Sequence, residues 1–276
     1  MSVDEFMEEY WPLDPIFSLD EPAYKQELER RFGKETLAES HRLDVGVDRD
    51  ESDKSAWDAA FTFAYDTGLN TLVNPLAEVR NRETLRALLS VMDHPGVITD
   101  LGCGDGRTSI GLAIYTGAIV RAVDKLPAAI NALQRNLDRL PRKYAHVRNR
   151  VVPIRADYHS SHNELRRRNQ LVVATYQPDV ADLNPHLAAI MDKTAIVAHP
   201  IAPSADFDSG AVSYFAGNLL REIDWLGREH NIRFKEMGLF NAAWHGKDIN
   251  CLLYGAERPP KDWKPHLPPS VLNDFD

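Results

Sequence analysis

The chain has 276 residues, of which 43% are hydrophobic and 26% are charged. These values are typical of a globular protein with a packed core, and they exclude a wholly disordered or fibrous chain. The formal net charge of −9 disfavours nucleic acid as the main partner, because neutralising backbone phosphates normally requires a basic surface.

The length favours one large domain with an added cap or arm. The two cysteines, Cys103 and Cys251, are too few for a disulfide framework and do not stand at metal-ligand spacing. The amino-terminal residues lack the basic start and apolar run of a signal peptide, and no stretch approaches the length of a transmembrane helix. We therefore expect a cytoplasmic protein without a membrane partner or a bound metal.

Residues 1–95 are predicted to form a helical amino-terminal cap or lid. A charged helix is expected over residues 25–32, and an acidic loop over residues 48–53 follows it. Another helix is expected over residues 78–91, and it ends near a His-Pro-Gly sequence that cannot continue it.

Three aromatic residues within this region, Trp57, Phe61 and Tyr65, recur at a spacing of four. This spacing places their rings on one face of a helix. Packing in the core is the favoured interpretation, and an aromatic wall over a ligand pocket is the alternative.

From residue 97 onward, short apolar runs alternate with helical patterns. Such alternation predicts a mostly parallel sheet with helices on both faces, and the short loop between the last two strands predicts an antiparallel hairpin. The expected fold is α/β: a Rossmann-like, mostly parallel sheet of seven strands with a carboxyl-terminal antiparallel β-hairpin, within a domain of residues 96–258 that precedes a Pro-rich tail of residues 259–276. The expected strands cover residues 97–101, 118–123, 150–156, 171–176, 194–198, 233–243 and 249–256, and the expected helices cover residues 108–115, 127–140, 161–168, 182–191 and 212–229.

A glycine-rich turn, with the sequence DLGCGDG from Asp100, joins the first of these strands to the first helix. Gly102, Gly104 and Gly106 allow tight backbone conformations and close approach of a ligand. The start of the following helix offers free N–H groups that suit a polar or anionic ligand group. The turn is therefore a candidate ligand site.

Two further acids stand where the next two strands end. Asp124 ends the second strand, and Asp157 follows the third. Ligands of open α/β sheets bind at the carboxyl ends of the strands, so both acids should converge on the glycine-rich turn. Either acid alone could be an ordinary loop cap, but their joint occurrence beside the glycines favours a site.

This set of features resembles the class I S-adenosylmethionine-dependent methyltransferases, over roughly residues 97–256. The resemblance rests on the D-x-G-x-G-x-G turn, the acids that end the second and third strands, and the terminal hairpin. It implies S-adenosyl-L-methionine as the cofactor and S-adenosyl-L-homocysteine as the product. It also implies a cofactor site formed by Asp100, Gly102, Cys103, Gly104, Gly106, Asp124, Lys125, Asp157 and Tyr158.

By the same resemblance, the three glycines lie under the methionine and ribose of the cofactor. Asp100 supports the loop or reaches the cofactor's amino group, and Asp124 accepts hydrogen bonds from the ribose hydroxyls. Asp157 accepts from the adenine amino group, with Tyr158 or Leu126 beside the ring. A dinucleotide dehydrogenase is a minor alternative, because its turn has the spacing G-x-G-x-x-G and this chain has G-x-G-x-G.

Methyl transfer requires an acceptor that is aligned with the sulfonium methyl and, for some acceptors, a base that removes a proton. His199 follows the fifth strand, His245 lies in the hairpin loop and Tyr176 ends the fourth strand, so these three are the candidate catalytic residues. For each of them, an ordinary surface or packing role is at least as common.

The favoured acceptor is a small molecule held under the cap. The runner-up is an RNA or a protein bound by the Arg- and Lys-rich segment of residues 135–168; nucleic acid is not favoured, because few aromatic residues interleave with that segment. From another class, the chain could be a non-catalytic cofactor-binding subunit that activates a partner.

Overall fold

The computed structural model describes residues 1–49, 54–69, 75–93, 95–175, 180–203, 232–244 and 247–259. The helix predicted over residues 212–229 and the tail after residue 259 lie outside the described residues. Within them, no helix is both long enough and apolar enough to cross a membrane.

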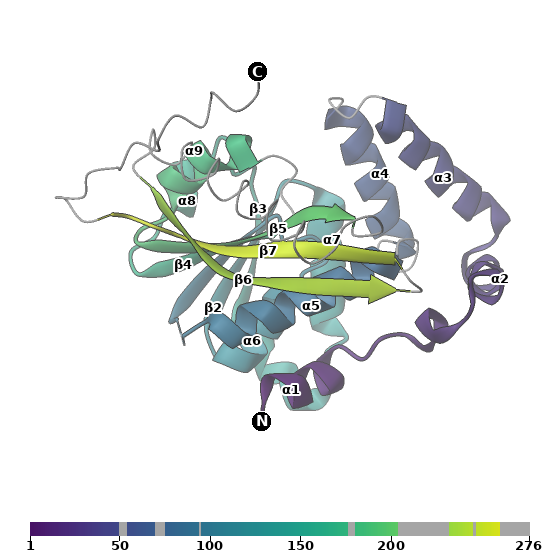
Figure 1. The fold of residues 1–276 in the computed structure, drawn as a ribbon, viewed down its shortest axis with the longest axis horizontal. Helices are drawn as coiled ribbons and strands as arrows, with labels where there is room; N and C mark the ends of the chain where they lie inside the picture. The colour runs from purple at the N-terminus through teal and green to yellow at the C-terminus, as the bar shows by residue number, and fades with distance from the viewer. Residues whose placement is uncertain are drawn as a thin grey trace, which may run out of the picture.

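A single sheet of seven strands has the order β3-β2-β1-β4-β5-β7-β6 (Figure 1). The first five strands pair in parallel, whereas β7 runs antiparallel to both β5 and β6. The predicted α/β fold with its terminal hairpin is therefore confirmed. The strands are β1 (Val97–Leu101), β2 (Ile119–Asp124), β3 (Val151–Arg155), β4 (Gln170–Thr175), β5 (Thr194–Pro203), β6 (Arg233–Trp244) and β7 (Lys247–Glu257).

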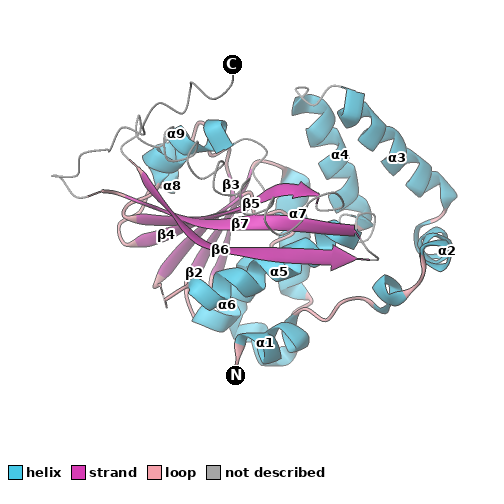
Figure 2. Ribbon diagram, in the orientation of Figure 1, coloured by secondary structure: helices cyan, strands magenta, loops and turns pink. Residues whose placement is uncertain are grey.

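Helices cover both faces of this sheet (Figure 2). Successive side chains of a strand point to opposite faces, so the neighbours Val172 and Val173 are buried in different cores. The first core lies under α1, α5, α6 and α7, and the second lies under α8 and α9. The helices are α1 (Val3–Tyr10), α2 (Glu21–Phe32), α3 (Lys34–Arg49), α4 (Lys54–Thr67), α5 (Pro75–Val91), α6 (Arg107–Thr116), α7 (Pro127–Asp138), α8 (His162–Leu165) and α9 (Val180–Ile190), with 3-10 turns η1 (Pro15–Ser18) and η3 (Arg142–Asn149).

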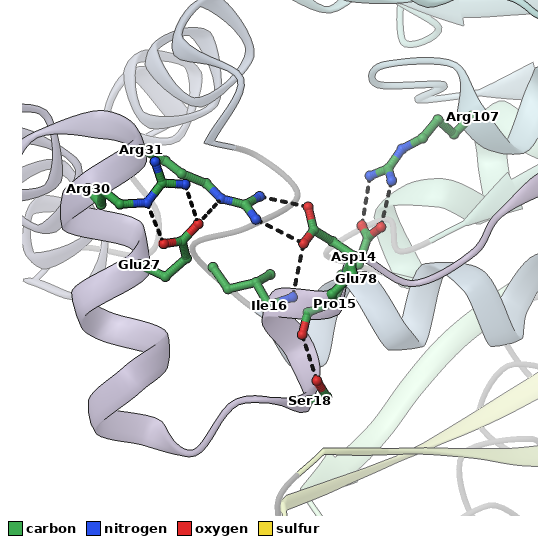
Figure 3. Close-up of polar contacts among 9 residues, drawn as sticks. All are labelled: Asp14, Pro15, Ile16, Ser18, Glu27, Arg30, Arg31, Glu78 and Arg107. Carbon is green, nitrogen blue, oxygen red and sulfur yellow. Dashed lines mark hydrogen bonds and ion pairs between the residues drawn. The ribbon is translucent and has the colours of Figure 1, made fainter.

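The amino-terminal segment is attached to the sheet domain by its first helix. Phe6 and Met7 of α1 are fully buried in the first core. After α1, the chain turns away through η1 and α2. Arg31 of α2 joins them by an ion pair with Asp14, which caps η1, and it also pairs with Glu27 within α2 (Figure 3). Helices α3 and α4 then return antiparallel to one another, and α4 packs against α7 (Figure 1).

Three elements differ from the prediction. The acidic segment expected as a loop begins inside α3, which continues to Arg49. Helix α8 ends at Leu165, well before residue 168, because Arg166 already takes an extended conformation with φ −67° and ψ 129°. Strand β5 continues to Pro203, because β7 pairs with it through Ile249.

Candidate functional site

The glycine-rich turn lies at the carboxyl end of β1. Gly102, Gly104 and Gly106 have φ values of 72°, 56° and 78°, which place all three in the left-handed region that side chains disfavour. A Cβ atom at Gly106 would also lie 2.0 Å from Cδ1 of Leu133 in α7. Both backbone conformation and packing therefore require glycine at position 106.

The turn is fastened to the end of β2. The backbone N–H groups of Gly102 and Cys103 donate to the carbonyl oxygen of Val123 at 2.8 and 2.9 Å. The N–H of Gly104 donates to Oδ2 of Asp124 at 3.0 Å. The second-strand acid predicted to bind a ribose is thus already part of the frame that shapes the turn.

Asp124 keeps capacity for further hydrogen bonds. Its Oδ1 accepts from the N–H of Leu126 at 2.9 Å, and each oxygen of an ionised carboxylate offers two lone pairs. Burial raises the pKa of Asp124, although the N–H groups of Leu126 and Gly104 act in the opposite direction. A ligand with two hydroxyl donors could therefore bind Asp124 without breaking the frame.

A second acid, Asp100, lies fully buried at the end of β1. The hydroxyl of Ser109 donates to its Oδ2 at 2.5 Å. Its Oδ1 has no hydrogen-bond partner among the described residues. Burial raises the pKa of Asp100 to about 7, with Asp124 adding to the rise and Ser109 opposing it. A buried acceptor without a partner is rare in folded proteins and points to a missing donor, such as an ammonium group.

Helix α4 lies over this turn. The hydroxyl oxygen of Tyr65 is 2.6 Å from the position that a Cβ atom would take at Gly104. Arg135 of α7 donates to the carbonyl oxygen of Tyr65 at 2.8 Å, and Lys125 forms an ion pair of 2.7 Å with Asp58. Lys125, predicted beside the cofactor, thus also ties α4 to the end of β2.

Arg107, the first residue of α6, is held from several directions. Its Nη1 and Nη2 donate to the two carboxylate oxygens of Glu78 in α5 at 2.6 and 2.7 Å (Figure 3). Its Nε donates to Asp105 at 3.0 Å, and its guanidinium stacks 4.4 Å from the ring centroid of Trp11. The indole N–H of Trp11 also donates to Glu78 at 2.8 Å. The amino-terminal segment and α5 therefore position the start of α6.

Beyond β3, the structure gathers aromatic and imidazole rings around Asp157. The ring and backbone N–H of His159 lie 2.8 and 3.0 Å from Asp157 Oδ1. Partial burial acts to raise the pKa of Asp157, but these hydrogen bonds outweigh it and hold the pKa below its usual value. Tyr158 stacks on the ring of His159 with centroids 4.2 Å apart. Asp157 and Tyr158, predicted at the adenine, are thus neighbours in one cluster.

Sequence reasoning did not identify His186 of α9 as a member of this cluster. Its Nδ1 lies 2.8 Å from Nε2 of His162, and its ring centroid is 4.5 Å from that of His159. A residue 24 positions away gives no local signal of such a contact. Although three histidines meet here, no group of side chains suited to a metal ion occurs in the part of the chain that the structure describes.

Of the three candidate catalytic residues, the structure describes only the backbone of His199. Tyr176 and His245 lie outside the described residues. The backbone of His199 lies in β5, paired with Leu252 of β7, and its side chain is not among those described. Their catalytic roles stay predictions.

Comparisons with known proteins find similarity in structure alone. No protein-family model and no curated protein matches the sequence. TYW2 of M. jannaschii in complex with AdoMet is 17% identical, with a TM-score of 0.48 over 65% of this chain and 76% of that one. Magnesium protoporphyrin IX methyltransferase from Synechocystis, with bound SAM, is 18% identical, with a TM-score of 0.42 over 67% and 79%. Precorrin-6y C5,15-methyltransferase from Geobacter metallireducens is 12% identical, with a TM-score of 0.47 over 64% and 89%. At these values, the site must be interpreted from its own residues.

Proposed function

We propose that the chain is an S-adenosylmethionine-dependent methyltransferase that acts on a small-molecule acceptor. The observation that carries the proposal is the pair of acids beside the glycine-rich turn. Asp124 holds Gly104 and retains lone pairs for two hydroxyl donors, while Asp100 has a buried oxygen without a partner. A ligand that carries both a ribose and an ammonium group would match these acceptors.

The bound cofactor would supply an electrophilic methyl group on sulfur. The chain's own residues would hold the ribose at Asp124, hold the ammonium at Asp100, and align the acceptor with the methyl carbon. Three left-handed glycines let the backbone approach the ligand closely. Tyr65 would form one wall of the site, because its hydroxyl already lies against Gly104.

A small acceptor is supported by the acidic net charge of −9 and by the aromatic row on α4. Trp57, Phe61 and Tyr65 stack in series, with centroid separations of 5.6 and 6.3 Å. Trp57 and Phe61 remain 37% and 44% exposed, so this row is not a packed core. It offers an accessible apolar surface that adjoins the glycine-rich turn through Tyr65.

Calorimetric titration of the purified chain tests the proposal together with the role of Asp124. The wild-type chain should bind S-adenosylmethionine and S-adenosylhomocysteine and should not bind NAD. Asp124→Ala should weaken cofactor binding at least tenfold, because each hydrogen bond to a charged group is worth roughly 1.5–3 kcal/mol. Asp138→Ala, which removes an exposed carboxylate from the far end of α7, should change the affinity by much less. Unchanged affinity in Asp124→Ala would remove the ribose from this position, and binding of NAD instead would overturn the proposal.

The pH dependence of cofactor affinity tests Asp100. Its pKa of about 7 means that the carboxyl group must lose a proton to pair with the cofactor's ammonium. Affinity should therefore rise with pH, by up to about tenfold per unit below pH 7, and level off above it. Asp100→Asn should bind more weakly above pH 7 and lose most of this slope; an Asp100→Asn variant with the wild-type slope would contradict the assignment.

The raised pKa of Asp100 also predicts how the free energy of unfolding depends on pH. The folded chain keeps Asp100 protonated up to about pH 7, whereas the unfolded chain releases that proton near pH 4, roughly the ordinary value for aspartate. Between these values the folded state binds more protons, so its free energy of unfolding should fall as pH rises. Asp100→Asn should reduce this fall in urea denaturation measured without cofactor.

A further inference from the structure

A pocket of about 350 Å³ lies away from the glycine-rich turn. Its lining residues are Asn163, Arg166, Arg167, Arg168 and Asp192. The three arginines directly precede β4, and Asp192 shortly precedes β5. Since β4 and β5 run parallel to β1, the pocket lies at the amino ends of the strands, opposite the candidate site at their carboxyl ends.

The pocket carries an excess of positive charge. Three guanidinium groups and one carboxylate belong to its lining, which therefore has a net charge of +2. Within the described part of the chain, no salt bridge involves Arg166, Arg167 or Arg168. This local charge stands out on a chain whose overall charge is −9.

The positive charge of the pocket also contributes to lowering the pKa values of two neighbouring arginines. Burial, and then repulsion from Arg167, lowers the pKa of Arg121 in β2. Burial, and then repulsion from Arg166, lowers the pKa of Arg258, with Asp192 acting in the opposite direction. A cluster of cations that forms no ion pair among the described residues creates a local potential that attracts anions.

The arginine loop is also held in place by backbone contacts. Arg121 donates to the carbonyl oxygens of Leu165 and Glu164 at 2.6 and 2.9 Å, which fixes the start of the loop. At its other end, Asn169 has a φ of 55°, and its N–H donates to Asp192 at 2.9 Å. Asp192 therefore holds the end of the loop by a hydrogen bond and also lines the pocket. An ordered loop reduces the entropy lost when a ligand binds.

We propose that this pocket binds a phosphate group. Guanidinium groups present several N–H donors in a planar fork that matches phosphate oxygens, and they stay charged at any physiological pH. The phosphate could belong to a free phosphorylated molecule or to the phosphodiester chain of an RNA. The pocket lies at the opposite edge of the sheet, so the proposal does not depend on methyl transfer.

Calorimetry with two probes distinguishes these sources. One probe is inorganic pyrophosphate, and the other is a single-stranded ribo-oligonucleotide without terminal phosphates. The double variant Arg166→Gln/Arg168→Gln should bind whichever probe the wild-type chain binds at least tenfold more weakly than the wild-type chain does. The control Arg139→Gln/Arg142→Gln removes the same charge from two exposed arginines outside the pocket and should bind nearly as tightly as the wild-type chain.

Each outcome has a defined meaning. Pyrophosphate binding alone supports a free phosphorylated ligand, and oligonucleotide binding alone supports a phosphodiester. The affinity should fall as salt rises, because phosphate contacts release counterions. If the wild-type chain binds neither probe at low salt, or if both double variants weaken binding equally, the proposal is wrong. Retained binding of S-adenosylmethionine by the pocket variant would show that this variant is folded. If the wild-type chain does not bind that cofactor, pyrophosphate binding at the pocket still supports the phosphate site.

Discussion

Gly106→Ala is expected to lower the free energy of unfolding by about 2–5 kcal/mol. A left-handed backbone costs a residue with a side chain roughly 1–2 kcal/mol, and Gly106 has φ 78° and ψ 7°. The new Cβ atom would also lie 2.0 Å from Cδ1 of Leu133, which is fully buried and has little room to move. Overpacking of this kind typically costs about 1–3 kcal/mol. Urea denaturation measures the total.

The chain contains a matched control for this substitution. Gly117, at the other end of α6, has nearly the same conformation, with φ 73° and ψ 6°. A Cβ atom there would meet only Nη1 of Arg150, at 3.4 Å, so Gly117→Ala should show the backbone cost alone. Combining Gly106→Ala with Leu133→Ala should cost less than the sum of the two single losses, because the smaller side chain leaves room for the new methyl group. If Gly106→Ala destabilises the chain no more than Gly117→Ala does, the close packing of the turn on α7 is incorrect.

Glu78→Gln is expected to lower the free energy of unfolding by about 2–3 kcal/mol and to weaken cofactor binding. Removing one partner from a buried ion pair typically costs about 3–5 kcal/mol. We expect a smaller loss because the side chain of Arg107 remains 23% exposed and still contacts Asp105 and the ring of Trp11. Since Arg107 begins α6 directly after the glycine-rich turn, loosening it should also disturb the ligand site.

The surface of the chain offers a pair of the same chemistry for comparison. Glu39 accepts two hydrogen bonds from Arg42 at 2.8 and 2.6 Å, but both side chains are largely exposed. Exposed pairs contribute roughly 0–1 kcal/mol, so Glu39→Gln should have little effect on denaturation or on cofactor affinity. Equal losses in the two variants would contradict a structural role for the buried pair.

Much of the fold could be predicted because strands and helices leave short-range patterns of apolar residues in the sequence. Short apolar runs separated by helical patterns located all seven strands, since a strand buried on both faces needs a continuous apolar segment. The prediction failed at α3 and at the end of α8. Among the side chains of α3 that the structure describes, over residues 34–43, Ser40 alone is buried, so no apolar period marks this helix. At α8 the helix stops because Arg166 takes an extended conformation.

The sequence by itself determined the glycine-rich turn and the acids that follow the strands. A left-handed backbone restricts the choice of residue at each glycine, so the requirement is visible position by position. The parallel order of elements also places Asp124 at the same edge as the turn. That Asp124 directly binds the N–H of Gly104 was not predictable, because it depends on atomic distances between two loops.

Only the tertiary structure decided which distant segments meet. It inserted β7 between β5 and β6, brought Glu78 and Trp11 to Arg107, and set Tyr65 against Gly104. It also placed the arginines before β4 beside Asp192 in one pocket. These contacts join residues that no helical or strand period relates, and they form because the two cores are filled by side chains from every part of the chain at once.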